Sequence, residues 1–209
     1  MNQENQEKKV YENFFPLTEN EKEQIGTRRT NLWNGLFDLI ISTAVTLIIA
    51  IFIRVFVLQP FTVDGQSMEP TFQTADYIFV DEITYRFRDP KRGEIVIFDP
   101  PDVNDFYIKR VIGLPNESIE ITKDGEIKIY NEKNPNGFIL KENYIDIKTS
   151  SYYPKRLLKE DEYFVMGDNR FIGGSRDSRE FGPIHKDSIK GKAWVRLFPN
   201  FKFFLDNKS

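Results

Sequence analysis

The chain has 209 residues, which is enough for one folded domain and a tail or for two small domains. Its 29 Lys and Arg residues against 32 Asp and Glu residues give a formal charge of −3, and this balance disfavours a nucleic-acid-binding protein. The chain has no cysteine and a single histidine, His185, so disulfides, thiolate catalysis, the common structural zinc sites and any two-histidine mechanism are excluded.

An uncharged segment near the N-terminus, residues 39–53, reads LIISTAVTLIIAIFI. As a helix it would span about 22 Å, which is short of a hydrocarbon core of about 30 Å. Arg54 can extend its charge to the membrane interface, so that the apolar residues through Leu58 add to the span. Pro60 ends the segment because proline cannot continue a helix. We therefore predict one transmembrane helix with its flanks over residues 31–58.

The alternatives to a membrane span are a buried core helix and a cleaved secretory signal. A long apolar run without a polar face argues against the first, and the late start without a following small-x-small site argues against the second. The preceding residues, 1–30, are polar, and we predict a mobile or loosely helical tail. Three basic residues closely precede the span, and none follows it before Arg86. The positive-inside rule then predicts a cytoplasmic tail and an extracytoplasmic domain over residues 59–209.

The rest of the chain has the pattern of β structure. Short apolar or alternating runs predict strands at 94–98, 107–112, 118–122, 126–130, 163–166 and 193–198. Asp124-Gly125 predicts a hairpin turn. Residues 131–162 are charged and interrupted by proline and glycine, so we predict long loops there. The predicted fold class is mostly β: an antiparallel domain with a smaller inserted β and loop region over roughly 114–162.

A candidate nucleophile lies in the segment Gly65–Thr71, GQSMEPT. Ser67 stands there between a glycine and a proline, which suits an ordinary turn as well as a nucleophile. A serine hydroxyl is scarcely ionised at neutral pH and needs a base. We interpret His185 as a surface residue because a charged, loop-like stretch follows it. Lysine is the other candidate base.

Lys109 is the best lysine candidate. In the predicted strand YIKRVI, alternation places Lys109 on the same face as Tyr107 and Val111 and places Arg110 on the opposite face. A lysine between such neighbours can lose its water, and this lowers its pKa. A useful base would need the pKa to fall from about 10.4 to about 7–8. The alternative is an edge-strand lysine that reaches solvent.

A third cluster, residues 167–179, reads GDNRFIGGSRDSR. Glycine, asparagine and aspartate at this density are typical of a tight, irregular loop. Such a loop is either a turn with local side-chain caps or a segment that orients a catalytic group. Asp168 and Asp177 also suggest calcium ligands, but their spacing does not fit an EF-hand loop, and we expect no metal site.

Together these motifs resemble those of a bacterial type I signal peptidase of the Gram-positive form, a membrane-anchored Ser-Lys endopeptidase that removes signal peptides from exported proteins. The resemblance covers nearly all of residues 28–200. It comprises, in order, IRVFVLQPFTV, GQSMEPTF, RGEIVIF, YIKRVIGLP and GDNR…SRDSREFGP. It implies that Ser67 is the nucleophile and that Lys109 is the general base, which later protonates the leaving amine. It implies no cofactor.

The resemblance also assigns supporting groups around the nucleophile. The backbone N–H of Ser67 would form part of the oxyanion hole, and Gly65 stands where some members have an additional serine donor. Ser175 matches a serine that hydrogen-bonds the lysine. Four residues separate Arg170 from Ser175, however, where two are common in the family.

Further residues are assigned to support and to substrate binding. Asp177 and Arg179 match residues that brace the site, and we expect Arg110 to pair with Asp177. The substrate would bind as an added strand, with small side chains at the first and third positions before the cut. The residues expected to line those positions are Phe61, Val63, Met68, Tyr107 and Ile108.

We expect a monomeric, single-pass protein of the cell membrane that binds no nucleic acid. The resemblance implies that its partners are signal-peptide-bearing preproteins, and the predicted span implies contact with membrane lipid. Two other functions remain open. One is a membrane-tethered β domain that binds an extracytoplasmic partner without catalysis, and the other is a Ser-Lys autoprotease of the self-cleaving repressor type. The C-terminal run FPNFKFFLD is either a final core strand, which we favour, or an apolar rim in contact with lipid.

Overall fold

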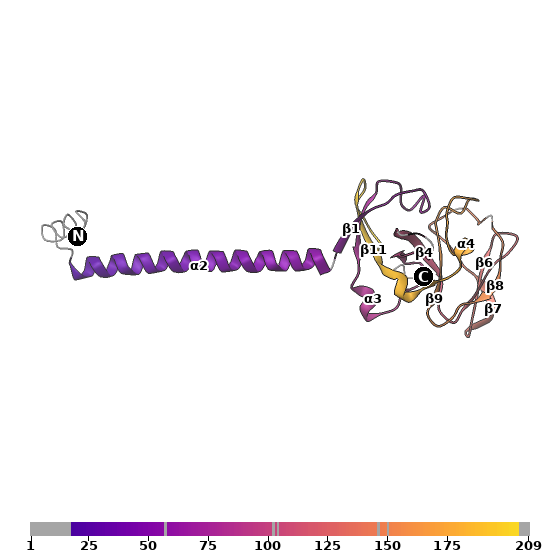
Figure 1. The fold of residues 1–209 in the computed structure, drawn as a ribbon, viewed down its shortest axis with the longest axis horizontal. Helices are drawn as coiled ribbons and strands as arrows, with labels where there is room; N and C mark the ends of the chain where they lie inside the picture. Colours follow the sequence, from indigo (N-terminus) through magenta and orange to yellow (C-terminus); the bar gives the residue numbers. More distant parts are fainter. Residues whose placement is uncertain are drawn as a thin grey trace. The chain divides into compact units, whose positions relative to one another are not determined.

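The computed structural model describes residues 18–56, 58–101, 103, 105–145, 147–149 and 151–204, and Figure 1 traces its elements. The chain divides into two compact units, Met1–Phe52 and Ile53–Ser209.

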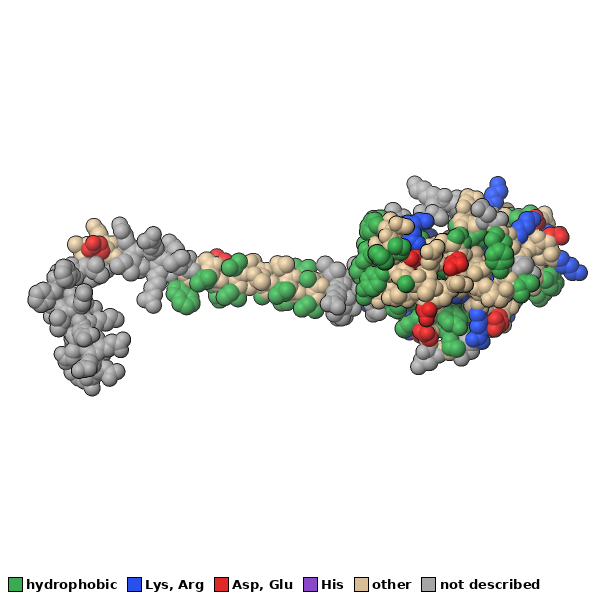
Figure 2. Space-filling model, turned by 90° about the horizontal axis from the view of Figure 1, so that it is seen from above, with side chains coloured by type: hydrophobic (Ala, Val, Ile, Leu, Met, Phe, Trp, Pro, Cys, Tyr) green, Lys and Arg blue, Asp and Glu red, His purple; other side chains and the backbone are tan. Residues whose placement is uncertain are grey.

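The first unit is dominated by helix α2, Glu19–Phe56. Thr18 and Glu21 cap its start reciprocally: the Glu21 carboxylate accepts from the Thr18 N–H at 2.9 Å, and Thr18 Oγ1 accepts from the Glu21 N–H. Within the helix, Trp33–Ile51 has a mean hydropathy of 1.9 and exposes its apolar side chains, which Figure 2 shows along the described part of the helix. This stretch is long and apolar enough to cross a membrane.

The predicted helix is therefore present, with different ends. It begins at Glu19, so the last part of the predicted tail is helical, whereas the prediction for residues 1–17 lies outside the described residues. It ends at Phe56, before Pro60, which lies in a strand. The predicted position of the Arg54 side chain also lies outside the described residues.

The second unit contains two antiparallel sheets, with β6, β7 and β8 gathered at one side of the unit in Figure 1. The larger sheet has the order β1-β2-β11-β3-β4-β9-β10, with β12 also paired to β11. Its strands are β1 (Leu58–Thr62), β2 (Tyr77–Asp81), β3 (Ile95–Phe98), β4 (Tyr107–Gly113), β9 (Glu162–Met166), β10 (Ile184–His185), β11 (Ile189–Phe198) and β12 (Lys202–Phe203).

The smaller sheet has the order β7-β6-β5-β8. Its strands are β5 (Ser118–Ile121), β6 (Ile127–Asn131), β7 (Asn134–Ile139) and β8 (Tyr153–Leu157). The connections carry the short helices α3 (Thr84–Phe87) and α4 (Ser178–Phe181) and a 3₁₀ turn, Lys186–Ser188.

Strand β4 lies between β3 and β9 in the larger sheet and contributes to all three hydrophobic clusters of the unit. Ile108 packs against the cluster that contains Met68 and Phe72, Ile112 belongs to the cluster of the smaller sheet, and Val111 belongs to the third. The middle of β4 is consequently buried, including two charged residues, Lys109 and Arg110. The fold thus holds two ionic side chains away from water on adjacent positions of one strand.

All six predicted strands are present, and the predicted fold class is confirmed. The Asp124-Gly125 turn is also confirmed, because Gly125 has a φ of 78° and its N–H donates to Thr122 O. The prediction of long loops over residues 131–162 was correct only in part. The segment contains β7 and β8, but the described residues between them, 140–145, 147–149 and 151–152, belong to no helix or strand. Strand β2, with the sequence YIFVD, was not predicted. Its residues alternate between buried and more exposed positions in the structure.

The C-terminal aromatic run combines the two expected arrangements. The Phe204 ring packs on Phe72, with centroids 4.6 Å apart, and adds to the hydrophobic core. Phe198, Phe201 and Phe203, in contrast, are largely exposed. The described part of the run, residues 198–204, therefore contains the short strand β12, one ring packed on the core and an exposed aromatic rim.

Candidate active site

Ser67 lies in the loop between β1 and β2, and Lys109 projects from β4. The Lys109 Nζ atom donates to Ser67 Oγ at 2.8 Å and to the carbonyl oxygen of Ile108 at 2.9 Å. Buried Met68 and Phe72 anchor the loop after Ser67, and the Phe72 N–H donates to Met68 O at 2.9 Å. The hydroxyl is therefore held beside the amine by core packing on both sides of the contact.

The electrostatic environment of Lys109 differs from that of a surface lysine. The side chain is 3% exposed, and burial lowers its pKa from 10.5 to about 8 by disfavouring the ammonium form. The carboxylates of Asp177 and Asp168 oppose this change, whereas the Arg179 guanidinium adds to it. A substantial fraction of the amine is consequently neutral near pH 8 and can accept a proton from the adjacent hydroxyl.

Asp177 organises the loop that faces this pair. Its fully buried carboxylate accepts hydrogen bonds from the Gly167 N–H at 2.9 Å, from Ser175 Oγ at 2.8 Å and from Arg179 Nη2 at 2.7 Å. Ser175 therefore donates to Asp177, and among the described contacts it makes no hydrogen bond with Lys109, in contrast to the prediction. A Cβ on Gly167 would lie 2.2 Å from Ser175 Oγ and 2.3 Å from Ser67 O, so the two loops meet at this glycine.

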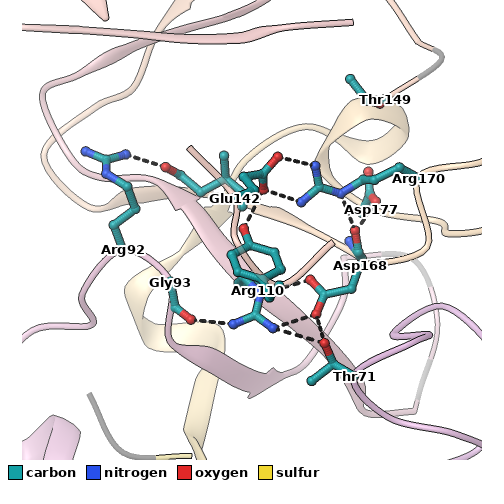
Figure 3. A network of polar contacts seen from close by, with 12 residues as sticks. Thr71, Arg92, Gly93, Arg110, Glu142, Thr149, Asp168, Arg170 and Asp177 are labelled. Atoms are coloured by element: carbon teal, nitrogen blue, oxygen red, sulfur yellow. Dashed lines mark hydrogen bonds and ion pairs between the residues drawn. The ribbon is translucent and has the colours of Figure 1, made fainter. Parts of the chain in front are cut away.

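Arg110 pairs with Asp168 and not with Asp177, which corrects the predicted ion pair. Its Nε and Nη2 atoms donate to the two carboxylate oxygens at 2.9 and 2.5 Å, and Thr71 Oγ1 donates to the same carboxylate, as Figure 3 shows. The reason is strand alternation. Arg110 points to the opposite face of β4 from Lys109, and Asp177 lies on the Lys109 side, where Arg179 pairs with it.

Two residues of the inserted region that support this network, Glu142 and Tyr144, were not predicted from the sequence. Glu142 accepts from the buried Arg170 guanidinium, whose Nε atom also donates to Gly167 O at 2.7 Å. The Tyr144 ring stacks on Arg110, with 3.8 Å between the guanidinium carbon and the ring centroid. Figure 3 shows the contact of Arg170 with Glu142. Neither residue belongs to a motif, so only the packing of this segment against the 167–170 loop identifies them.

The burial of the Arg110–Asp168 ion pair leads to a prediction about the stability of the fold. Asp168→Ala is expected to destabilise the fold by about 3–5 kcal/mol, because the change leaves a buried guanidinium without its carboxylate. Chemical denaturation of the full-length protein in detergent measures the effect. Asp161→Ala is the matched control, since Asp161 contacts His185 at the surface and its loss should leave the midpoint almost unchanged. Equal midpoints for Asp168→Ala and the wild type would contradict the prediction.

A cavity of about 310 Å³ opens beside the Ser67–Lys109 pair, and we call it the serine cavity. Four of the five residues predicted to bind substrate line it, namely Phe61, Val63, Tyr107 and Ile108. The fifth, Met68, is not among the lining residues and is buried in the hydrophobic cluster. The cavity therefore presents an apolar wall directly beside the hydroxyl.

Metal ligation is not indicated by the described part of the chain. No group of three or more His, Cys, Asp or Glu side chains that could hold an ion occurs there. The two candidate calcium ligands, Asp168 and Asp177, are each engaged by an arginine. His185 is exposed, and its Nδ1 atom lies 2.7 Å from Asp161.

Comparisons with known proteins identify the family of the chain. Residues 36–198 match the family described as "Signal peptidase, peptidase S26". The chain is 38% identical over 175 residues to a probable signal peptidase I-2 of Synechocystis, covering 81% of this chain and 75% of that protein. It is 34% identical over 178 residues to a signal peptidase I of Bacillus licheniformis, covering 82% of this chain and 94% of that protein.

Among solved structures, a signal peptidase I from Enterococcus faecalis aligns at 30% identity with a TM-score of 0.40, covering 50% of this chain and 97% of that chain. The family match extends over most of the chain and includes the loop of Ser67, strand β4 and the 167–179 loop. The chain therefore belongs to the signal peptidase family, peptidase S26.

Proposed function

We propose that this peptidase is anchored in the membrane and removes signal peptides from exported preproteins, with Ser67 as nucleophile and Lys109 as general base. The observation that carries the proposal is the 2.8 Å contact between Lys109 Nζ and Ser67 Oγ. The lowered pKa of the buried amine gives this contact its chemistry, because a cationic lysine could not accept the serine proton.

The reaction proceeds by acyl transfer. Neutral Lys109 takes the proton of Ser67 as Oγ attacks the scissile carbonyl, and the backbone N–H of Ser67 stabilises the oxyanion of the tetrahedral intermediate. The ammonium then gives its proton to the leaving amine, and the C–N bond breaks. Water attacks the acyl-enzyme with Lys109 again acting as base, which releases the signal peptide and restores the serine.

The substrate binds as an extended segment with its acyl half in the serine cavity. Phe61 and Val63 line this cavity from one side, and Ile108 lines it from β4. The resemblance to the family implies small side chains at the first and third positions before the cut. Helix α2 places the peptidase in the membrane, with the N-terminus cytoplasmic, so that it meets emerging preproteins at a high effective concentration.

The proposal is tested with the full-length chain reconstituted in detergent micelles and a synthetic preprotein. Mass spectrometry should find two products from one cut after the signal peptide, with many turnovers per enzyme. Binding of the preprotein without cleavage would favour the non-catalytic β domain instead. A single cut within the enzyme chain itself, without cleavage of the preprotein, would favour the autoprotease.

Gly167 offers a test of how closely the 167–179 loop must approach the nucleophile. Gly167→Ala is expected to lower kcat by about 10²-fold, because the added methyl group would displace Ser67 O or Ser175 and move the nucleophile by a fraction of an ångström or more. The measurement is the steady-state cleavage rate at saturating preprotein.

Gly35→Ala is the matched control for this change, because a Cβ at Gly35 meets open space. It should leave kcat unchanged. Wild-type kcat for Gly167→Ala would show that the two loops can separate without cost to catalysis.

A further inference from the structure

A second cavity, of about 260 Å³, lies next to the Ser67 loop. The serine cavity is lined by Ser67, by residues that precede it in the loop, and by residues of β2, β3 and β4 with their flanks. The lining of the second cavity includes Glu69 and Pro70, which follow Ser67 in the same loop, and includes neither Ser67 nor Lys109. The loop of Ser67 thus contributes to the walls of both cavities.

Asn169 joins the wall of the second cavity to the nucleophile. Its backbone N–H donates to Ser67 O at 3.1 Å, and its Nδ2 atom donates to Gln66 O at the same distance. Its Oδ1 atom accepts from the N–H of Phe171, the aromatic residue of this wall. Hydrogen bonds of the Asn169 backbone and side chain therefore fix the position of this wall relative to Ser67.

The exposed residues of the second cavity's lining, Pro70, Ile147 and Phe171, are all apolar. Ile147 and Phe171 are 44% and 60% exposed, and Ile145 is half-buried. Two charged residues of the lining, Asp168 and Arg170, have fully buried side chains paired with other groups. Exposed apolar side chains gathered in a hollow are typical of a binding surface.

Glu69 is the remaining charged residue of this lining and is half-buried. Because it lines the same cavity, its carboxylate would repel an acidic group that entered. The chemistry of the cavity therefore favours an uncharged apolar side chain over glycine, and glycine over aspartate.

We infer that the second cavity binds an apolar side chain from the mature half of the substrate, within the first three residues after the scissile bond. This inference rests on the proposed function. A peptide whose acyl half fills the serine cavity must continue past Ser67, and Asn169 of the second cavity's wall donates directly to Ser67 O. Phe171 and Ile147 are then specificity-determining residues.

Peptides that share one signal-peptide half test the inference with the full-length enzyme in micelles. Leucine, glycine or aspartate is placed in turn at each of the first three positions after the cut. At one position the wild type should show about tenfold higher kcat/KM for leucine than for glycine, and lower values for aspartate. Phe171→Ala and Ile147→Ala should each reduce the leucine-to-glycine ratio to about twofold.

Ile172→Ala is the matched control. Ile172 neighbours Phe171 and is 83% exposed, but it does not line the cavity, so the ratio should remain at the wild-type value. Equal ratios in the wild type and Phe171→Ala, with all peptides cleaved, would overturn the inference and leave the proposed function intact. Failure of the wild type to cleave any of the peptides would overturn both.

Discussion

Replacing Ser67 by alanine is expected to lower kcat/KM for preprotein cleavage by about 10⁴-fold or more. The change removes the atom that forms the acyl-enzyme, and only substrate binding and oxyanion stabilisation remain. The fold should persist, because Lys109 Nζ keeps its hydrogen bond to Ile108 O and the core anchors Met68 and Phe72 are untouched. Initial rates with a synthetic preprotein measure the loss, and thermal unfolding verifies the fold.

Ser188→Ala is the matched control for this loss. Ser188 lies in the 3₁₀ turn after β10, and its hydroxyl donates to His185 O at 2.7 Å, outside the serine cavity. This variant should keep the wild-type rate. Cleavage by Ser67→Ala within tenfold of the wild type would mean that another group is the nucleophile.

Strand alternation in YIKRVI predicted the opposite directions of Lys109 and Arg110, and this prediction was correct. The partner of Arg110 could not be predicted in the same way. Asp168 and Asp177 belong to one irregular loop, and nothing in a loop sequence fixes the side on which each carboxylate emerges. The three-dimensional path of the loop places Asp168 on the Arg110 face and Asp177 with Arg179.

The strands that the sequence analysis missed include edge strands with proline. In the smaller sheet, β7 and β8 are the outer strands and contain Pro135 and Pro154. In the larger sheet, β1 is the outer strand and contains Pro60. An edge strand tolerates proline because one of its sides has no ladder to maintain, so proline signals a loop in the sequence while the strand still forms.

The supporting contacts of the site were beyond sequence reasoning for a related reason. Glu142 and Arg170 are 28 positions apart in the chain, and Tyr144 contacts Arg110 of β4 from the inserted region. No local pattern encodes such pairings. They arise because the smaller sheet is inserted between β4 and β9, which returns its connecting segment to the 167–170 loop.

Replacing Lys109 by arginine is expected to lower kcat/KM by about 10³–10⁴-fold, because a guanidinium remains protonated and cannot accept the Ser67 proton. In the wild type, the neutral fraction of an amine with a pKa of about 8 rises from roughly a tenth at pH 7 to roughly nine-tenths at pH 9. The rate should therefore increase with pH over this range and level off above it. Cleavage rates measured from pH 6 to 10 test both expectations.

Two further variants separate this catalytic role from a role in folding. Lys109→Met should be as inactive as Lys109→Arg yet at least as stable as the wild type near pH 7, because it removes a buried ammonium that folding must desolvate. The stability of the wild type should depend on pH in the same sense. Between pH 8 and 10.5 the unfolded chain binds more protons at this amine than the folded chain does, so the free energy of unfolding increases as pH rises through that window. Lys192→Arg alters another buried lysine, paired with Glu94 at 3.0 Å, and should retain activity. An active Lys109→Arg enzyme, or a wild-type rate independent of pH from 6 to 9, would contradict the assignment of Lys109 as the base.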